Sequence, residues 1–371
     1  MNSRFAHIDW ILLFATLPLV GAGLVTMREL GNNVDYFFTR QIIWAIASFG
    51  VFFVFSFIDW RFLKKGEFLL FLFGASSALL LILLAVGKTV RGVSSWIDLG
   101  FLSIEPADPI KILLILMLAK YFSRRHVEIA HVKHIIVSGF YAVVPFMLVF
   151  LQPDLGSAFV IFMIWLGMII IAGASKKHLA LLVLASLLIA VTSWLFVLKP
   201  YQKNRLTTFI NPLSDIRGAG YNALQSTIAV GSGEIFGKGI GYGSQSRLQF
   251  LPEHQTDFIF AAFAEEWGFV GVIFIFTFFG IIVWRISWNA YLAPGNFESL
   301  FGLGLVILIT THFIINVGMN IGLLPITGLN LPFISYGGTN MLTIFASLGM
   351  LMGMRRFGAQ AIRGDTTMEV N

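Results

Sequence analysis

The chain has no cysteine, and only 12% of its 371 residues are charged. Without cysteine there is no disulfide framework and no thiolate chemistry. Soluble domains are about one quarter charged, so the low charge excludes an ordinary globular protein. The hydrophobic fraction of 57% and the mean hydropathy of +0.84 predict a polytopic membrane protein instead. The net charge of +6 then indicates membrane orientation and not affinity for nucleic acid.

Long apolar runs recur along the chain, and each is long enough or nearly long enough to cross a bilayer. No small-residue cleavage site precedes Met27, so the first run is interpreted as a retained span and not as a signal peptide. The sequence therefore predicts an all-α polytopic membrane protein with ten transmembrane helices, over residues 8–27, 40–58, 67–86, 108–123, 134–152, 156–173, 178–198, 258–286, 299–323 and 339–354.

Lysine and arginine indicate how the predicted helices are oriented, because cytoplasmic loops are enriched in them. The loops on the side of the two termini carry basic clusters at 61–65, 120–133, 176–177 and 355–363. The short loops on the opposite side carry only Arg28, Arg40, Lys88 and Arg91. Both termini are therefore predicted to be cytoplasmic.

One predicted extracytoplasmic loop, 199–257 between spans seven and eight, is long, and a loop of this length without evident regular structure is usually functional. It holds the glycine run VGSGEIFGKGIGYGSQS at 230–246. This run lacks the spacing of a phosphate-binding loop, because Ser232 stands where a glycine is required and Gly239 where serine or threonine is required. A flexible loop packed on the membrane surface is the favoured interpretation. The whole chain, 1–371, is predicted to form one membrane domain that includes this loop.

Charged side chains gather at the outer ends of the predicted spans. Glu105, Asp108 and Lys111 follow one another at spacings of three and share a face if the stretch is helical. Asp154 lies in a turn between two spans, and Asp257 opens the eighth. Each one alone is equally well explained by a structural ion pair. Several at one depth predict a polar cavity that opens outward, because ionisable groups in a membrane protein usually face such a cavity.

Two further acids, Glu265 and Glu266, lie about 12 Å deeper along the same predicted helix. For Glu266 a hydrogen-bonded structural role inside the bundle is favoured. Glu265 is on roughly the face of Asp257, so both a structural and a functional role stay open for it. His312 stands alone among apolar neighbours and is interpreted as a satisfied core histidine.

The residues alone leave two functions open. No nucleophile triad and no zinc-ligand spacing is evident. A carboxylate in an outward cavity, with a lysine and a basic loop nearby, suits a general base that acts on a hydroxyl while cations stabilise an anionic leaving group such as a diphosphate. The same set equally suits a binding site for an anionic lipid headgroup without any chemistry.

The stretch NVGMNIGLLPITGLNLPFISYGGTN at 316–340 is a long motif with characteristic asparagine, glycine and proline positions. It resembles the C-terminal signature of the SEDS family, the bacterial proteins of shape, elongation, division and sporulation. FLPEHQTDFIFAAFAEEWG at 250–268, LQPDLGSA at 151–158 and WIDLG at 96–100 match as well. The resemblance covers nearly the whole chain and is closer to the RodA branch than to the FtsW branch.

This resemblance implies a peptidoglycan glycosyltransferase of the bacterial cytoplasmic membrane. It would polymerise lipid II on the outer face by inverting transfer, with polyprenyl diphosphate as the leaving group. The implied partners are lipid II, a class B penicillin-binding protein with transpeptidase activity, the elongation machinery and membrane lipids, with no nucleic acid. A divalent cation, Mg²⁺ or Mn²⁺, is the expected cofactor, and no nucleotide is needed because the diphosphate linkage supplies the driving force.

The resemblance also implies roles for single residues. The essential acid of the family lies in a Thr-Asp-Phe-Ile motif, which corresponds here to Asp257, the expected general base. The family cavity corresponds to Lys111, Asp108 and Asp154, and cations of the long loop would also face the substrate. The expected substrate-binding residues are Lys111, Asp108, Asp154, Arg205, Lys238 and Glu265.

The chain departs from the family pattern around this site. Glu105-Pro106-Ala107-Asp108 stands where the family has Gln-Pro-Ser-Glu, so the acid at Asp108 is one methylene shorter. Ser95 precedes Trp96 where the family often has arginine, and Arg91 is the nearby cation that would compensate. Two other functions are weighed beside the enzyme: a lipid II flippase and a non-catalytic scaffold for a transpeptidase. Acids clustered on one side, without paired broken helices, speak against the transporter.

Overall fold

The computed structural model describes residues 7–28, 34–86, 97–98, 103–124, 132–196, 200–215 and 218–368. The long helices are α1 (Trp10–Arg28), α2 (Val34–Phe57), α3 (Glu67–Val86), α4 (Ala107–Ser123), α5 (Val132–Leu151), α6 (Leu155–Ala172), α7 (Lys176–Phe196), α11 (Ile259–Tyr291), α12 (Asn296–Asn320) and α13 (Gly338–Met368). The shorter elements are η2 (Trp60–Lys65), α8 (Pro200–Ile210), η3 (Pro212–Asp215), α9 (Ala219–Ser232), α10 (Ser244–Arg247) and a two-stranded ribbon of β1 (Ile97–Asp98) and β2 (Ser103–Ile104).

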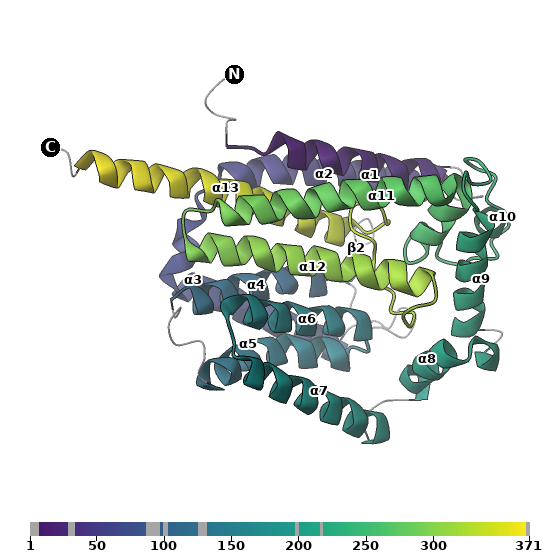
Figure 1. The fold of residues 1–371 in the computed structure, drawn as a ribbon, viewed down its shortest axis with the longest axis horizontal. Coiled ribbons are helices and arrows are strands. Elements are labelled where there is room, and N and C mark those ends of the chain that lie inside the picture. The colour runs from purple at the N-terminus through teal and green to yellow at the C-terminus, as the bar shows by residue number, and fades with distance from the viewer. Residues whose placement is uncertain are drawn as a thin grey trace.

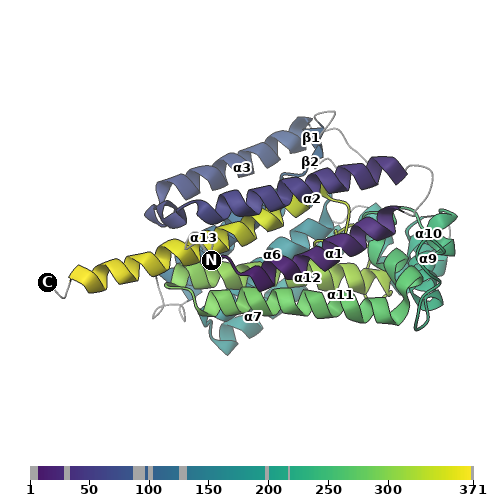
Figure 2. The same ribbon diagram turned by 90° about the horizontal axis from the view of Figure 1, so that it is seen from above.

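The long helices lie side by side in one bundle, and α8, α9 and α10 lie across one end of it, which we call the loop end (Figure 1). Helix α1 begins and α13 ends at the opposite end, which we call the terminal end (Figures 1 and 2). The helices alternate in direction, so α4, α6, α11 and α13 all begin at the loop end. This arrangement places the first turns of four helices close to the segment that precedes α11.

Eight helices of the described part are long and apolar enough to cross a membrane: α1, α2, α3, α5, α6, α7, α11 and α12. Two further helices belong to the same bundle, because α4 packs against α3, α6 and α12, and α13 packs against α2. Helix α7 has no buried residue in its apolar window, as expected for a helix that faces lipid on most of its surface. The prediction of an all-helical polytopic membrane protein is therefore confirmed.

Small residues let the helices approach closely, which is the usual packing mode in membranes. A side chain at Gly304 of α12 would overlap Ile115 of α4, and one at Gly349 of α13 would overlap the backbone carbonyl of Phe52 in α2. A side chain at Gly23 of α1 would likewise overlap the carbonyl of Ile334. These contacts bring α12 and α13 into the centre of the bundle.

At the terminal end a buried polar cluster connects three helices. Asp9 accepts hydrogen bonds from Arg285 Nε at 2.9 Å and from Asn289 Nδ2 at 2.6 Å, both on α11. Arg355 of α13 donates to Asn289 Oδ1 at 2.6 Å. The ends of α1, α11 and α13 are thus joined by charge-assisted hydrogen bonds.

The long segment before α11 has more regular structure than the sequence suggested. The prediction of a loop without regular structure over 199–257 was wrong, because α8, η3, α9 and α10 account for much of it. Helix α9 packs against both α11 and α12, so its apolar side chains are held by the bundle. Mixed polar and apolar residues at helical spacing in 219–232 were the available sign of this helix.

The glycine run packs against a break in α11 and is not a flexible surface loop. At Gly268 the backbone of α11 leaves the helical region, with φ 64° and ψ −164°. Lys238 N and Gly239 N donate to the carbonyl groups of Glu265 and Glu266 at 2.9 and 3.0 Å. The backbone groups that the break frees are therefore paired with the glycine run, as buried backbone requires.

Candidate functional site

Asp257 lies two residues before the first residue of α11, and two side-chain amides of α12 hold its backbone. Its carbonyl oxygen accepts hydrogen bonds from Asn316 Nδ2 at 3.0 Å and from Asn320 Nδ2 at 3.1 Å. Asn320 Oδ1 in turn accepts from Ala261 N at 3.2 Å and from Ser226 Oγ of α9 at 3.1 Å. Both asparagines are fully buried. The position of Asp257 is thus set by α9, α11 and α12 together.

The segment after α12 holds the two residues before Asp257. Ser335 Oγ donates to the carbonyl of Thr256 at 2.7 Å, and Tyr336 N donates to the carbonyl of Gln255 at 2.9 Å. Leu331 N donates to Ser335 Oγ at 2.8 Å, which orients that hydroxyl. The signature over 316–340 is therefore a framework that holds the Thr-Asp-Phe-Ile stretch.

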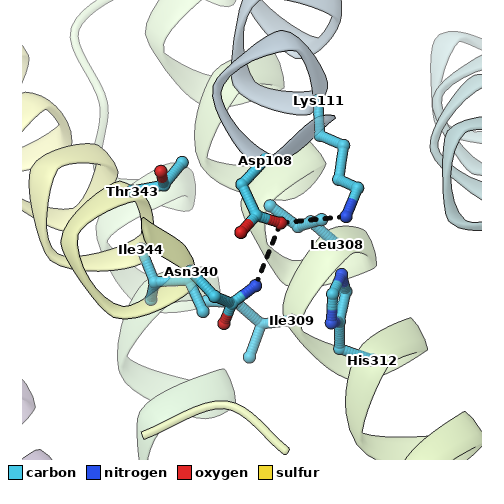
Figure 3. A pocket seen from close by; sticks show the side chains of 8 residues that line it. All are labelled: Asp108, Lys111, Leu308, Ile309, His312, Asn340, Thr343 and Ile344. Atoms are coloured by element: carbon cyan, nitrogen blue, oxygen red, sulfur yellow. Dashed lines mark hydrogen bonds and ion pairs between the residues drawn. The ribbon is translucent and has the colours of Figure 1, made fainter. Parts of the chain in front are cut away.

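The same framework also holds the first turn of α4. Asn340 Nδ2 donates to Asp108 Oδ1 at 3.2 Å, and the same oxygen accepts from Lys111 Nζ at 3.0 Å (Figure 3). Glu105 N donates to Thr339 Oγ1 at 3.2 Å. Asp108 and Lys111 are both buried. Their spacing of three residues was correctly predicted to put them on one helical face.

Asp154 lies next to this framework. It caps the N-terminus of α6, where its Oδ1 accepts from Ser157 N at 2.9 Å. A side chain at Gly156 would overlap Leu329 and the carbonyl of Thr327, so the start of α6 packs against the 327–329 segment. A side chain at Gly328 would in turn touch Asp257 Oδ2 at 3.5 Å. The 327–329 segment thus contacts both the first turn of α6, which Asp154 caps, and the carboxylate of Asp257.

The pKa of Glu105 is affected by burial and by the charges of Asp108, Asp154, Lys111 and Asp257. Burial, followed by the carboxylates of Asp108 and Asp154, raises the pKa of Glu105 well above its ordinary value. Lys111 acts in the opposite sense, and Asp257 adds a smaller upward contribution. Four carboxyl groups and one lysine therefore converge at the loop end of the bundle. The sequence placed Glu105 on this helical face but did not select it as a site residue.

His312 corrects one interpretation from the sequence. It was expected to be a satisfied core histidine, but only its Nδ1 has a partner, the carbonyl of Asn330 at 3.3 Å. The ring lies beside Lys111 and Asp108 in a small cavity between α4, α12 and α13 (Figure 3). Its Nε2 is buried and has no hydrogen-bond partner within the described part of the chain. His312 therefore belongs to the surroundings of the Asp108–Lys111 pair.

A second polar cluster surrounds Glu265 and lies deeper in α11. Glu265 is fully buried and its Oε1 accepts from Lys238 Nζ at 2.7 Å and from Ser244 Oγ at 3.0 Å. Gln245 N donates to both of its carboxylate oxygens, at 3.1 and 3.2 Å. Glu266 Oε1 accepts from Gly241 N at 3.1 Å. Both glutamates thus bind the glycine run, as a structural role predicts.

The expected substrate-binding residues separate into two groups. Lys111, Asp108 and Asp154 gather with Asp257, whereas Lys238 and Glu265 pair with each other. Arg205 belongs to α8, and its side chain is outside the described part. Arg91, Ser95 and Trp96 also lie outside the described residues, so the departure at Ser95 has no structural account.

The arrangement can accept a proton and bind an anion. Within the described ranges no three acidic or histidine side chains are placed to hold a metal ion together. The buried Lys111 supplies positive charge, and Asp257 is partly exposed. The sequence analysis did not select three residues of this site, which are buried amides in apolar helices: Asn316, Asn320 and Asn340. Polar side chains inside an apolar helix are energetically unfavourable and usually functional, and this was the sign that could have identified them.

Comparisons with known proteins agree with one another. The family model described as cell cycle protein, which covers FtsW, RodA and SpoVE, matches residues 3–360. The chain is 36% identical over 360 residues to the FtsW of Pseudoalteromonas translucida, named as a probable peptidoglycan glycosyltransferase, with 93% of this chain and 88% of that protein covered.

Solved structures show the same likeness. A chain from a structure described as structural coordination of polymerization and crosslinking by a peptidoglycan synthase complex is similar with a TM-score of 0.82 and 29% identity, covering 95% of this chain and 98% of that chain. The rod shape determining protein RodA of Thermus thermophilus is similar with a TM-score of 0.71 and 27% identity, covering 95% of this chain and 98% of that chain. The likeness extends over nearly the whole length of both.

Proposed function

The chain belongs to the family of FtsW, RodA and SpoVE and is a peptidoglycan glycosyltransferase, and we propose that it polymerises lipid II with Asp257 as the general base. The observation that carries this proposal is the convergence of Asp257 with Asp108, Lys111 and Asp154 on one framework. General acid–base catalysis needs a carboxylate held rigidly beside the reacting hydroxyl. Lys111 and Asp154 retain the substrate-binding roles that the family resemblance implies.

We place the protein in the bacterial cytoplasmic membrane with ten spans. Eight of these spans are the candidate membrane helices, and α4 and α13 are the other two. Both termini are cytoplasmic in this topology, and the terminal end carries the basic clusters around Lys64, Arg285 and Arg355, as the positive-inside rule requires. Residues 1–371 form one membrane domain that includes the segment 199–257. The loop end, which contains this segment, then faces outward. Asp257 meets lipid-linked sugars there.

The reaction is a single displacement with inversion. The 4-hydroxyl of a lipid II sugar attacks the anomeric carbon of a lipid-diphosphate-linked glycan. A bond forms between that oxygen and the anomeric carbon while the bond from this carbon to the diphosphate oxygen breaks. Asp257 takes the proton of the attacking hydroxyl, and the diphosphate takes the electron pair. The α-linked diphosphate becomes a β-glycosidic bond without a covalent enzyme intermediate.

The leaving polyprenyl diphosphate needs positive charge close to its oxygens. Lys111 is the buried cation of the site, and Arg205 on α8 is the loop cation that we assign to the diphosphate. Mg²⁺ or Mn²⁺, the cofactor that the family resemblance implies, would supply further positive charge to the diphosphate when bound. No nucleotide takes part, because the diphosphate linkage supplies the driving force.

The partner that we infer is a class B penicillin-binding protein. A structural neighbour of this chain comes from a complex that coordinates polymerization and crosslinking. A polymerase alone makes uncrosslinked glycan, so a transpeptidase is the chemical complement of this activity. We assign the pair to the elongation machinery on the strength of the RodA resemblance.

The test is glycan formation from purified lipid II in detergent by the wild type and by Asp257→Asn. We expect the variant to fold normally and to lose about 10²–10⁴-fold in rate, the usual contribution of a general base. Glu253→Gln, which neutralises a partly exposed acid four residues earlier, is the matched control and should retain activity. Retained polymerisation in Asp257→Asn would remove Asp257 as the base. A folded wild type that makes no glycan in detergent would instead favour a flippase or a scaffold.

A further inference from the structure

A cavity of about 270 Å³ lies between α8, α9 and the segment after α12. Thr208 of α8, Leu224 and Thr227 of α9, and Met319, Leu324 and Ile326 around the end of α12 are among its lining residues. Its volume is slightly below the about 300 Å³ at which sites for small organic ligands begin. The cavity therefore has room for a short segment of a hydrocarbon chain.

One polar atom in this apolar lining has no hydrogen-bond partner among the described residues. The side chain of Thr208 is 1% exposed, and its Oγ1 has no hydrogen-bond partner among the described residues. A buried hydroxyl normally has a partner, because leaving it unpaired is unfavourable. By contrast, the Oγ1 of Thr227 is bound to the carbonyl of Ala223 at 2.9 Å. The ligand that fits is thus apolar along most of its length, with an oxygen at one point.

Exposed apolar side chains lead into the cavity. Phe209 and Leu224, which line it, are 37% and 44% exposed, and Ile210 beside them is 82% exposed. Helices α8 and α9 lie across the loop end of the bundle, where the proposed topology puts the outer membrane surface (Figure 1). These side chains give the cavity an apolar rim at this end of the bundle.

One wall of the cavity is continuous with the residues that hold Asp257. Met319 and Ile321 line the cavity, and Asn320 between them donates to the carbonyl of Asp257 at 3.1 Å. Leu324 N, on the same wall, donates to the carbonyl of Gly318 at 3.1 Å. The cavity wall and the backbone of Asp257 are thus held by the same end of α12.

We propose that this cavity binds the first isoprene units of the polyprenyl chain of the lipid-linked substrate, with the Thr208 hydroxyl donating to an oxygen of its diphosphate. This inference rests on the proposed function, because only a substrate whose chain ends in the reacting diphosphate has to be bound next to Asp257. A fatty acyl chain of a membrane phospholipid is the competing occupant. Its headgroup has no reason to lie beside Asp257.

The test uses photolabelling of the full-length protein in detergent. The probes are a polyprenyl diphosphate with a diazirine near its second isoprene unit and a phosphatidylglycerol with a diazirine on its acyl chain. The protein carries Asp257→Asn, so labelling does not depend on turnover. We expect the prenyl probe to label peptides of 208–228 or 319–326, and unlabelled polyprenyl diphosphate, but not phosphatidylglycerol, to compete. Labelling elsewhere, or equal labelling by the phospholipid probe, would overturn the proposal.

Two variants test the same point by kinetics. Leu224→Trp fills the cavity and should raise the KM for lipid II about tenfold while kcat changes little. Thr208→Val keeps the shape but removes the hydroxyl, and should raise KM several-fold. Leu323→Trp is the matched control, because Leu323 is 69% exposed on the same segment and does not line the cavity. An unchanged KM in both cavity variants would contradict the assignment even if the wild type is an active polymerase.

Discussion

Glu105 stands at the position where the resembled family carries glutamine, and it faces three other carboxyl groups. Its raised pKa follows from burial first and from Asp108 and Asp154 next. A protonated Glu105 is nearly isosteric with glutamine and can donate one hydrogen bond. The departure from the family pattern therefore keeps the chemistry of glutamine as long as the proton stays bound.

This residue gives stability a defined pH dependence. Below the ordinary pKa of glutamate the side chain is protonated in both the folded and the unfolded chain. Between that pKa and the raised folded pKa only the folded chain holds the proton, so stability falls as the pH rises through this window. Glu105→Gln should therefore melt higher than the wild type at pH 8, by on the order of 2 °C, with a smaller difference at pH 4. Thermal unfolding in detergent measures this, and an equal difference at both pH values would contradict the raised pKa.

The Asp108–Lys111 pair combines a structural and a functional role, and the two can be separated. Lys111→Met leaves the buried carboxylate of Asp108 without its cation and should cost about 3–5 kcal/mol of stability. The double variant Asp108→Asn with Lys111→Met should recover much of this stability, because no buried charge remains. Its polymerase activity should stay low, since the leaving diphosphate has lost its cation. Recovery of activity together with stability would show that Lys111 is only structural.

The break in α11 connects the glycine run to the helix that begins beside Asp257. Gly268 has a positive φ of 64°, and a side chain there would overlap backbone atoms of Ile235 and Gly237. The run is held on the other side by Glu265 through Lys238, Ser244 and the backbone of Gln245. Helix α11 and the glycine run at 230–246 thus pack together as one rigid part of the structure. A change in the run would be transmitted to the start of α11.

A pair of alanine substitutions in α11 tests this unit. Gly268→Ala should destabilise the protein by about 1–3 kcal/mol or more, because both the backbone conformation and the space are wrong for a side chain. Gly280→Ala is the matched control, since a side chain at Gly280 meets no atom within 4 Å and alanine favours the helix. Thermal unfolding and lipid II polymerisation should both fall only for Gly268→Ala. Equal melting temperatures for the two variants would contradict a packed break.

The bundle as a whole distributes its charges unevenly between its two ends. At the terminal end Asp9, Arg285 and Arg355 form the buried cluster, and Lys64 pairs with Glu298 at 2.5 Å. At the loop end acids predominate around Asp257. The proposed orientation of the molecule in the membrane rests on the lysine and arginine residues of the terminal end.

The absence of cysteine makes the orientation directly measurable. Single substitutions Tyr242→Cys, in the glycine run, and Lys177→Cys, at the start of α7, introduce one exposed thiol at each end. In intact cells a membrane-impermeant maleimide should label the Tyr242→Cys protein and not the Lys177→Cys protein. Both should react after the membrane is opened. The reverse pattern would invert the proposed topology.

The helices were predictable from the sequence because a membrane span is a local property. A run of about 20 apolar residues is enough to define one. The predicted span 156–173 is α6 (Leu155–Ala172), and the predicted span 67–86 coincides with α3. The seventh and eighth spans bracket an outer segment whose helices were missed. Of these helices, α9 packs against α11 and α12, so its position depends on tertiary contacts that its own sequence does not show.

The sequence by itself determined the class of the protein, the position of its long helices and the motif that contains Asp257. Only the tertiary structure decided which residues surround that acid. Asn320 lies 63 residues from Asp257, and Asn340 lies 232 residues from Asp108. It also paired Glu265 with Lys238 and left an apolar cavity beside Thr208. Hydrogen bonds between such distant residues depend on how helices pack, and helix packing is set by the complementarity of whole surfaces, which no local pattern records.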